Sequence, residues 1–364
     1  MSKLYIGLIS GTSADGIDAA LVDFSESQPK LIGNHYTAFS APLRKRILEL
    51  AQPSFNEINR VGELDVLLGR EFAQAANALL KKYHMDHKDI RAIGSHGQTV
   101  RHHPDLQFSL QIADPNIIAA DTGIITVADF RRRDMAYGGQ GAPLVPALHR
   151  ALLATQAKDR VVVNIGGIAN ITLLPKNSDS AIQGFDTGPG NNLQDAWIKK
   201  HGKKPYDDQG QWGATGVAHA DLLMNLLNDP YFQLPAPKST GPEYFNLAWL
   251  KKYLMPSINP VDVQTTLVEL TAQSIIDSIK KYFSSGDILV CGGGVHNHFL
   301  MQRLTELAKP FTVHSTQAFG VDPDWVEAIA FAWLAKQTLE KKPGNITTVT
   351  GAKQSTVLGA VYYV

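Results

Sequence analysis

The sequence predicts an α/β protein in two halves, each opening on two strands that a glycine turn joins. Strand-like apolar runs alternate with amphipathic helical segments along the chain, which is typical of an α/β fold. At 364 residues the chain is too long for one ordinary core, so two domains are expected. The 34 basic and 34 acidic residues give zero net charge, which argues against a general binder of nucleic acid or anionic membranes.

The first hairpin lies at the N-terminus. Leu4–Ile9 is predicted to be a strand, and after a polar glycine turn Ala19–Phe24 is again extended. A Rossmann or P-loop fold requires a helix directly after the turn, so this pattern excludes both. Residues 161–165, the turn Gly166-Gly167 and residues 168–174 repeat the pattern, which suggests a duplicated architecture.

The segments between and after the hairpins are assigned by periodicity. Residues 57–83 carry apolar side chains at i, i+3 and i+4 spacing, which predicts a long helix with one face in the core. The last segment, 355–364, is apolar enough to pack back onto the body. The other predicted elements are strands at 91–100 and 288–291, helices at 267–282, 299–308 and 325–339, and an ordered proline-rich loop at 230–242.

Cysteine content and hydropathy bear on the location of the protein. The only cysteine, Cys291, excludes an intrachain disulfide framework and a zinc site built on several cysteines. No stretch approaches 18 apolar residues, and no signal-peptide pattern precedes the first strand. A cytoplasmic enzyme is therefore expected.

The first glycine turn is a candidate phosphate site. Glycine allows successive N–H groups to approach a phosphate, and two hydroxyl residues add donors. Two aspartates in the turn would repel a bare phosphate, so they fit beside a magnesium ion or as turn formers. An ordinary hairpin turn is the open alternative. The residues are Gly11, Thr12, Ser13, Ala14, Asp15, Gly16, Ile17 and Asp18.

A second candidate is Asp186, which ends an apolar run and precedes glycines. Its carboxylate could act as a general base toward a sugar hydroxyl or water. The alternative is that it caps the next helix, predicted at 193–200. Asn191 and Asn192 are better placed for capping, which favours the functional interpretation of Asp186.

Four further features are weaker on their own. Gly292, Gly293 and Gly294, between a strand and a helix, could let an adenine or ribose lie against the backbone. The run Arg131–Arg133 abuts a glycine-rich loop and could pair with an anionic group, although such runs are more often solvated. Glu327 could face a cleft or complete a capping arrangement with Asp324, and His96 is more often a structural residue.

The order of these motifs resembles the acetate and sugar kinase/Hsp70/actin superfamily, and within it the anhydro-N-acetylmuramic acid kinase family. The similarity extends from Ile6 to Gly359. The runs that carry it are 11–18, 95–99, 129–146, 164–172, 184–191, 237–241 and 291–297.

This resemblance implies two ribonuclease-H-like (actin-like ATPase) domains flanking a central cleft, one of residues 1–130 plus about 345–364 and one of 131–344. It implies hydrolytic opening of the 1,6-anhydro ring and ATP-dependent phosphorylation of O6, in peptidoglycan recycling, by a homodimer that uses Mg²⁺. Asp186 would be the base. Residues 11–18, Gly166, Gly167 and 292–294 would bind ATP, Asp15 the metal, and Glu327, Arg131, Arg133 and His96 the sugar.

Two positions depart from the family pattern. Ala113 stands where glycine is expected, and Pro242 stands where arginine is expected, which removes a possible cation. Two alternatives stay open: another kinase of the superfamily that opens no ring, and an ATP-hydrolysing chaperone or switch. The second predicts an exposed client-binding module, for which the sequence has no extra segment.

Overall fold

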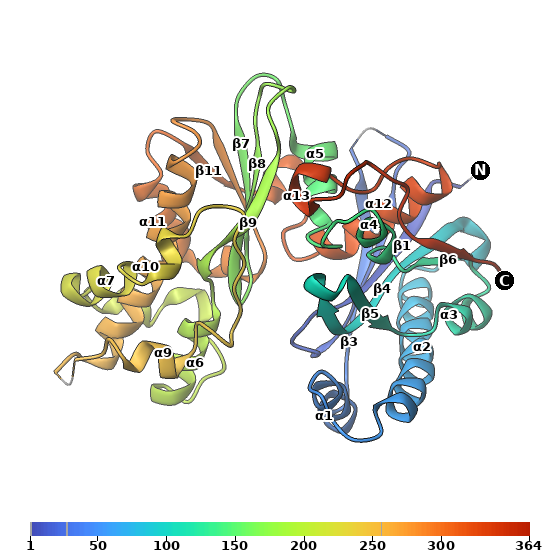
Figure 1. Cartoon of the computed structure of the whole chain (residues 1–364), viewed down its shortest axis with the longest axis horizontal. Coiled ribbons are helices and arrows are strands. Elements are labelled where there is room, and N and C mark those ends of the chain that lie inside the picture. Colours follow the sequence, from blue (N-terminus) through green and yellow to red (C-terminus); the bar gives the residue numbers. More distant parts are fainter. Residues whose placement is uncertain (1, 27, 256) are drawn as a thin grey trace. The chain divides into compact units, whose positions relative to one another are not determined.

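The computed structural model describes residues 2–26, 28–255 and 257–364, which form two compact units. The first unit holds Met1–Leu148 and Trp325–Val364, and the second holds His149–Asp324. The boundaries expected from the sequence lie near 130 and 345, whereas the units divide near 148 and 325. The later boundary differs because helix α12 (Val326–Leu339) packs on the first sheet (Figure 1). As a division into independently folding domains, the expected boundaries stay a prediction.

The first unit is built on a seven-stranded sheet in the order β12-β6-β4-β1-β2-β3, with β5 paired to β4. The meander β1-β2-β3 is antiparallel, whereas β4 runs parallel to β1 and β6 parallel to β4. The strands are β1 Leu4–Ser10, β2 Gly16–Asp23, β3 Lys30–Ala38, β4 Ile90–His103, β5 Phe108–Ile112, β6 Thr126–Ala128 and β12 Ala360–Tyr362.

The second unit is built on a five-stranded sheet in the order β11-β10-β7-β8-β9. Here too the first three strands in the chain are an antiparallel meander, and β10 and β11 continue the sheet in parallel. The strands are β7 Arg160–Ile165, β8 Ile168–Leu174, β9 Gln183–Pro189, β10 Asp287–Cys291 and β11 Thr312–Ser315.

The two sheets therefore share one strand order. Read from the third strand of each meander, they run β3-β2-β1-β4-β6 and β9-β8-β7-β10-β11, with the same directions. This is the order of the ribonuclease-H-like fold, so the predicted α/β class and the predicted duplication are confirmed. A cleft between the halves stays a prediction.

Helices cover the sheets as the periodicity indicates. In the first unit the predicted long helix is α2 (Glu57–Lys82), accompanied by α1 Ala41–Leu50, α3 Pro115–Thr122, α4 Arg132–Ala136 and α13 Thr347–Thr350. α5 (Val145–Leu153) runs across the first boundary. The second unit has α6 Asn192–His201, α7 Ala220–Leu227, α8 Pro230–Gln233, α9 Leu247–Lys251, α10 Pro260–Lys280 and α11 His298–Leu307.

Helices α2 and α12 lie on opposite faces of the first sheet. Ile6 and Leu8 of β1 share a buried core with α2, while Gly7 between them meets α12. Adjacent residues of a strand point to opposite faces, so the two helices sandwich β1. A Cβ on Gly7 would lie 1.8 Å from the carbonyl oxygen of Ala328, and one on Gly94 of β4 would lie 2.0 Å from that of Phe331. The helix backbone thus contacts the strand backbone at two glycines.

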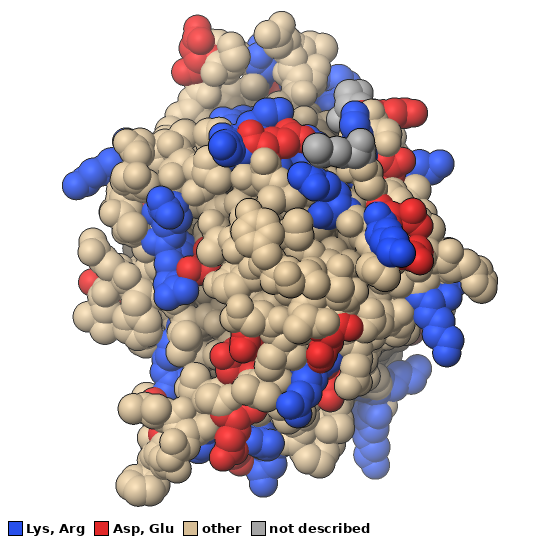
Figure 2. All heavy atoms as spheres, turned by 90° about the vertical axis from the view of Figure 1, so that its right-hand side faces the viewer, with Lys and Arg blue, Asp and Glu red and all other residues tan. Residues whose placement is uncertain are grey.

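The C-terminal segment returns to the first unit, as predicted. Strand β12 pairs antiparallel with β6, and Val361 lies opposite Val127. None of the helices in the described part of the chain is both long enough and apolar enough to cross a membrane. On the face that Figure 2 presents, Lys and Arg side chains are interspersed with Asp and Glu rather than gathered into a broad area of one sign.

The departure at Ala113 has a backbone cost. Its φ is 118°, in the region that favours glycine, and its N–H donates to Oδ1 of Asp65 at 2.8 Å. Asp114 follows and caps α3 through its side chain. An alanine here is therefore strained in a way that the expected glycine would not be.

The glycine contact under α12 predicts a large effect of one methyl group. Gly7→Ala should lower the free energy of unfolding by about 3 kcal/mol, because backbone must move to admit the Cβ. In the matched change Gly62→Ala, at an exposed position of α2, the added Cβ meets nothing within 4 Å, so the free energy of unfolding should rise by about 0.5–1 kcal/mol. Denaturant titrations measure both values, and equal effects would contradict the contact.

A second prediction concerns the strained alanine. Ala113→Gly should raise the free energy of unfolding by about 1 kcal/mol. Relief of the backbone strain contributes about 1–3 kcal/mol, and the greater conformational entropy of glycine in the unfolded chain offsets part of it. Ala119→Gly, six residues on and inside α3, should lower it by at least about 1 kcal/mol. The two thermal denaturation midpoints should move in opposite directions.

Candidate active site

The first glycine turn joins β1 to β2, and its first carbonyl oxygen, that of Gly11, is hydrogen-bonded within the protein. The oxygen of Gly11 accepts hydrogen bonds from the N–H of Ala14 at 3.1 Å and from Nε2 of Gln98 at 3.2 Å. Ser10 Oγ donates to Oε1 of the same Gln98 at 2.6 Å. Gln98 thus orients the turn from β4. Among the described residues, the N–H groups of Gly11, Thr12 and Ser13 have no acceptor, and these residues are exposed.

The other predicted residues of this turn have different surroundings. Ala14 and Ile17 are fully buried, and a Cβ on Gly16 would lie 2.4 Å from the oxygen of Thr37. Asp15 is exposed and pairs with Arg44 at 2.9 Å. Asp18 lies half-buried in β2. The structure therefore places only part of the predicted set where a ligand could touch it.

The second glycine turn, between β7 and β8, shows the same pattern of hydrogen-bonded carbonyl oxygens and N–H groups without acceptors. The oxygen of Gly166 accepts from the N–H of Asn191 at 2.8 Å, and that of Gly167 accepts from Gly190 and Asn192 at 2.9 and 3.2 Å. No acceptor for the N–H of Gly166 or Gly167 occurs in the described part of the chain.

The glycine run after β10 lies beside this second turn. β7 and β10 pair in register, with Cys291 opposite Asn164, so both strands end at one edge of the sheet. A Cβ on Gly292 would lie 2.4 Å from Oδ1 of Asn164, and one on Gly294 would lie 2.4 Å from Ile165. The run enters a 3₁₀ turn, Gly293–His296, before α11 begins at His298. The structure thus unites two motifs that lie more than a hundred residues apart in the sequence.

Asn191 shows that the capping interpretation was wrong. It precedes α6, but its side chain makes no capping hydrogen bond, and Nδ2 donates instead to the oxygen of Ile165 at 3.2 Å. Asn192 Nδ2 donates to the oxygen of Phe245. Asp186 does not cap the helix either, because it lies in β9 opposite Asn170.

Asp186 is half-buried under the loop that follows α8. The N–H of Thr240 donates to its Oδ2 at 2.9 Å, while its own N–H donates to the oxygen of Lys238 at 3.0 Å. Burial raises the pKa of Asp186 to about 6. Thr240 opposes this rise, nearby Glu243 adds to it, and Lys238 opposes it. A carboxylate with a pKa near neutrality suits proton transfer.

Two residues around Asp186 escaped sequence reasoning. Tyr231 Oη donates to the oxygen of Asp186 at 2.8 Å, and Lys238 Nζ donates to the oxygen of Tyr231 at 3.0 Å. They lie 45 and 52 positions further along the chain, Tyr231 in α8 and Lys238 in the loop after it. The sequence marks 230–242 as proline-rich and 237–241 as one of the runs that carry the family resemblance, but it assigns neither residue a role. No spacing rule connects them to Asp186.

In the first unit, Arg131 and His96 form a fixed pair. Arg131 donates through Nε and Nη2 to Nε2 of His96 at 3.1 and 2.9 Å, and through Nη1 to the oxygen of Gly141 at 2.8 Å. His96 Nδ1 then donates to the oxygen of Gly97 at 3.1 Å. Burial and the Arg131 charge hold the pKa of His96 well below its usual value, so the ring is neutral.

Glu327 opens α12 in the first unit. The side chain is accessible to solvent, yet desolvation by the surrounding protein raises its pKa, and the positive charge of Arg131 opposes this rise. Burial lowers the pKa of Arg131 to about 10, and Glu327 opposes that shift. Arg131 and Glu327 thus lie within electrostatic reach, whereas Arg133 is exposed on α4. The predicted cap at Asp324 was wrong: α12 has no side-chain cap, and Asp324 contacts His296 at 2.8 Å.

The comparisons decide the family. A family model described as anhydro-N-acetylmuramic acid kinase matches residues 3–364. The chain belongs to this family. Proteins with this name from Coxiella burnetii (strain Dugway 5J108-111) and Shewanella baltica (strain OS185) are 55% and 53% identical, over 99% and 98% of this chain and 97% of each relative. The predicted resemblance is therefore confirmed, and the chain is a kinase.

Solved structures are more distant. Component A of (R)-2-hydroxyglutaryl-CoA dehydratase from Acidaminococcus fermentans has 11% identity, a TM-score of 0.48 and coverage of 91% of this chain and 96% of its own. A ROK family glucokinase from Streptomyces griseus with glucose and AMPPNP has 14% identity, a TM-score of 0.44 and coverage of 92% and 99%. Such scores add nothing to the family assignment.

The magnesium ion expected of an anhydro-N-acetylmuramic acid kinase has no preformed cage here. The described residues contain no group of three or more His, Cys, Asp or Glu side chains arranged to hold a metal. Mg²⁺ often needs only one or two carboxylates beside the phosphates and its waters. Asp15 fits poorly in the state described, because Arg44 occupies its carboxylate.

A buried carboxylate, Asp134, orders the glycine-rich loop of this kinase. Oδ1 accepts from Nδ2 of Asn345 and Oγ1 of Thr350, both at 2.7 Å, and Oδ2 accepts from the N–H of Gly141 at 2.8 Å. All four residues lie in the first unit, and Asp134 is fully buried. The oxygen of Gly141 also accepts a hydrogen bond from Nη1 of Arg131. By holding Gly141, the Asp134 carboxylate therefore helps to position that guanidinium. Sequence reasoning missed Asp134, although it directly follows the arginine run.

Asp134→Asn should cost about 2–4 kcal/mol in the free energy of unfolding, because an amide NH₂ would face one of the buried donors. The control Asp121→Asn, at an exposed position of the same unit, should change stability by less than about 0.5 kcal/mol. Urea denaturation measures both. A tolerated Asp134→Asn would show that the three hydrogen bonds contribute little.

Proposed function

We propose that this chain opens the 1,6-anhydro ring of anhydro-N-acetylmuramic acid with water and phosphorylates O6, giving N-acetylmuramic acid 6-phosphate and ADP. The observation that carries the proposal is Asp186, whose pKa is about 6 and whose Oδ1 accepts no hydrogen bond among the described residues. A carboxylate that is largely ionised at pH 7 and has an available oxygen suits a general base.

In this reaction Asp186 takes a proton from a water molecule while the water oxygen attacks the anomeric carbon. The bond between that carbon and O6 breaks, and O6 keeps the electron pair. O6 then attacks the γ-phosphorus of ATP, the bond to the β-phosphate oxygen breaks, and ADP leaves. One carboxylate therefore starts both ring opening and phosphoryl transfer. Catalysis of the phosphoryl transfer itself comes from groups that stabilise the negative charge on the phosphates.

The glycine turns support a role in ATP binding. The oxygens of Gly11, Gly166 and Gly167 accept hydrogen bonds from neighbouring backbone, whereas the N–H groups of Gly11, Thr12, Ser13, Gly166 and Gly167 lack acceptors in the described part of the chain. Free backbone N–H groups in a turn are suited to phosphate oxygens. In the run Gly292–Gly294, Gly293 is the position with room for a nucleoside against the backbone, because Gly292 and Gly294 pack on β7. Mg²⁺, when bound, would offset the phosphate charge, and Asp15 would have to leave Arg44 to approach it.

For the sugar, we assign the lactyl carboxylate to Arg131 rather than Arg133. Arg131 is half-buried and held by His96 and Gly141, so it can offer a fixed cation. His96 would act by orienting Arg131, and Glu327 would accept a hydrogen bond from a sugar hydroxyl. The role in peptidoglycan recycling, the homodimer and the cytoplasmic location complete the proposal.

The coupled reaction is tested with the anhydro sugar, Mg-ATP and oxygen-18 water. The label should appear at the anomeric hydroxyl and the phosphate on O6, because water attacks carbon and O6 attacks phosphorus. Mass spectrometry of the product reads both positions. ADP formation with the ring intact would contradict ring opening and would favour another sugar kinase of this superfamily.

In the same assay Asp186→Asn should lower kcat by about 10²–10⁴-fold, the usual contribution of a general base. ATP affinity should stay within a few-fold, as measured by equilibrium binding. Asp179→Asn, an exposed change in the same unit, is the control and should leave both quantities unchanged. An active Asp186→Asn enzyme would remove the base assignment.

A further inference from the structure

Helix α8 and the loop after it close a ring of three hydrogen bonds around Asp186. Asp186 donates its N–H to the oxygen of Lys238, Lys238 Nζ donates to the oxygen of Tyr231, and Tyr231 Oη donates to the oxygen of Asp186. The distances are 3.0, 3.0 and 2.8 Å. Thr240 adds its N–H to the carboxylate itself. Each member of the ring is therefore placed by the other two.

Lys238 is held in an unusual position for a lysine. Its ammonium also lies 4.4 Å from the centre of the Tyr231 ring, and the side chain is only partly exposed. Burial lowers the pKa of Lys238 to about 8. Lys281 adds to this lowering, and Asp186 opposes it. Burying an ammonium costs free energy, so a neutral hydrogen-bond donor would secure the loop more cheaply.

We propose that Lys238 is a positioning residue that keeps Asp186 ionised for the reaction, and that Tyr231 holds the two in their relative place. This inference rests on the proposed function only in naming Asp186 as the base. The coupling between the two side chains is a separate claim, and it can be measured without turnover.

The other charges around Asp186 act in known directions. Glu243 disfavours its ionised form. Asp229 accepts hydrogen bonds from the N–H of Tyr231 and from the side chains of Tyr244, Trp249 and Tyr253. It thereby holds the aromatic side chains of Tyr244, Trp249 and Tyr253 in place near Tyr231. Burial and then the Asp186 charge raise the pKa of Tyr231, so its hydroxyl stays a donor. Lys238 is thus the cation that opposes Glu243 at the carboxylate.

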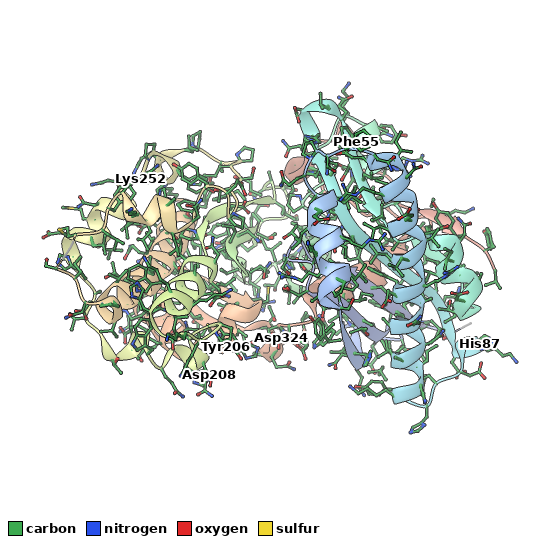
Figure 3. All side chains as sticks on the ribbon, turned by 90° about the horizontal axis from the view of Figure 1, so that it is seen from below. Phe55, His87, Tyr206, Asp208, Lys252 and Asp324 are labelled. Carbon is green, nitrogen blue, oxygen red and sulfur yellow. The ribbon has the colours of Figure 1, made fainter. Side chains whose placement is uncertain are left out.

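A merely structural role for Lys238 makes a different prediction. If its only task were to bind the oxygen of Tyr231, Lys238→Gln would preserve function, because the amide can still donate. If its charge matters, Lys238→Arg should preserve the ionisation of Asp186 and Lys238→Gln should not. The control Lys252→Gln changes an exposed lysine of the same unit that points outward from the α9 end (Figure 3).

The test is a pH titration of the full-length protein labelled with ¹³C at the aspartate side-chain carboxyl, with the Asp186 signal assigned by its loss in Asp186→Asn. Lys238→Gln should raise the pKa of Asp186 by about half a unit, because the ammonium favours the ionised carboxylate without contacting it directly. Lys238→Arg and Lys252→Gln should leave it unchanged. An unchanged Asp186 pKa in Lys238→Gln overturns the proposal.

The wild-type protein offers a second measurement that needs no variant at position 238. The Asp186 signal should show a further small step near pH 8, where Lys238 loses its proton, because coupled groups report each other's titration. A single-step curve overturns the proposal.

Kinetics separates this inference from the proposed function. The acidic limb of kcat/KM should move upward with the measured Asp186 pKa in Lys238→Gln, so that activity is lost at a higher pH as the base becomes protonated. If the NMR pKa moves and the kinetic limb does not, the coupling holds and Asp186 is not the base. If neither moves, the inference about Lys238 is overturned and the base assignment is judged by Asp186→Asn alone.

Discussion

The close approach of helix α12 to strands β1 and β4 is the constraint on which much of the first unit depends. Without side chains at Gly7 and Gly94, helix backbone meets strand backbone. This contact fixes the positions of residues on α12. The ring centroids of Phe331 and His96 lie 4.6 Å apart, and Glu327 lies close enough to Arg131 for their charges to interact. A shift of the helix by the width of one methyl group would separate the groups proposed to bind the sugar.

The two carboxylates of greatest interest are used in opposite ways. Asp134 accepts three hydrogen bonds and ties the C-terminal segment to the glycine-rich loop, so its oxygens are engaged in structure. Asp186 accepts one from Thr240, and the groups nearest to it bind its backbone rather than its carboxylate. Burial without full satisfaction leaves Asp186 able to exchange a proton near neutral pH.

Sequence patterns predicted the two hairpins, a long helix over 57–83 that the structure places at Glu57–Lys82, and the return of the C-terminus, because periodicity of apolar residues records which face is buried. They failed at helix starts: Asn191 and Asp324 have the right side chains for capping but find partners elsewhere in the fold. They also missed Tyr231 and Lys238, whose relation to Asp186 arises only when the loop folds over β9. Long-range contacts of this kind leave no mark in local spacing.

The hydrogen bonds to the oxygens of Gly11, Gly166 and Gly167 have a consequence for the thermodynamics of the proposed nucleotide binding. Gln98 in one unit and the N–H groups of residues 190–192 in the other hold the turns in shape before any ligand arrives. Ordering a flexible backbone costs about 1–2 kcal/mol per residue, and these turns have already met that cost during folding. In the proposed ATP complex, the association free energy would therefore go into contacts with the ligand rather than into ordering these turns.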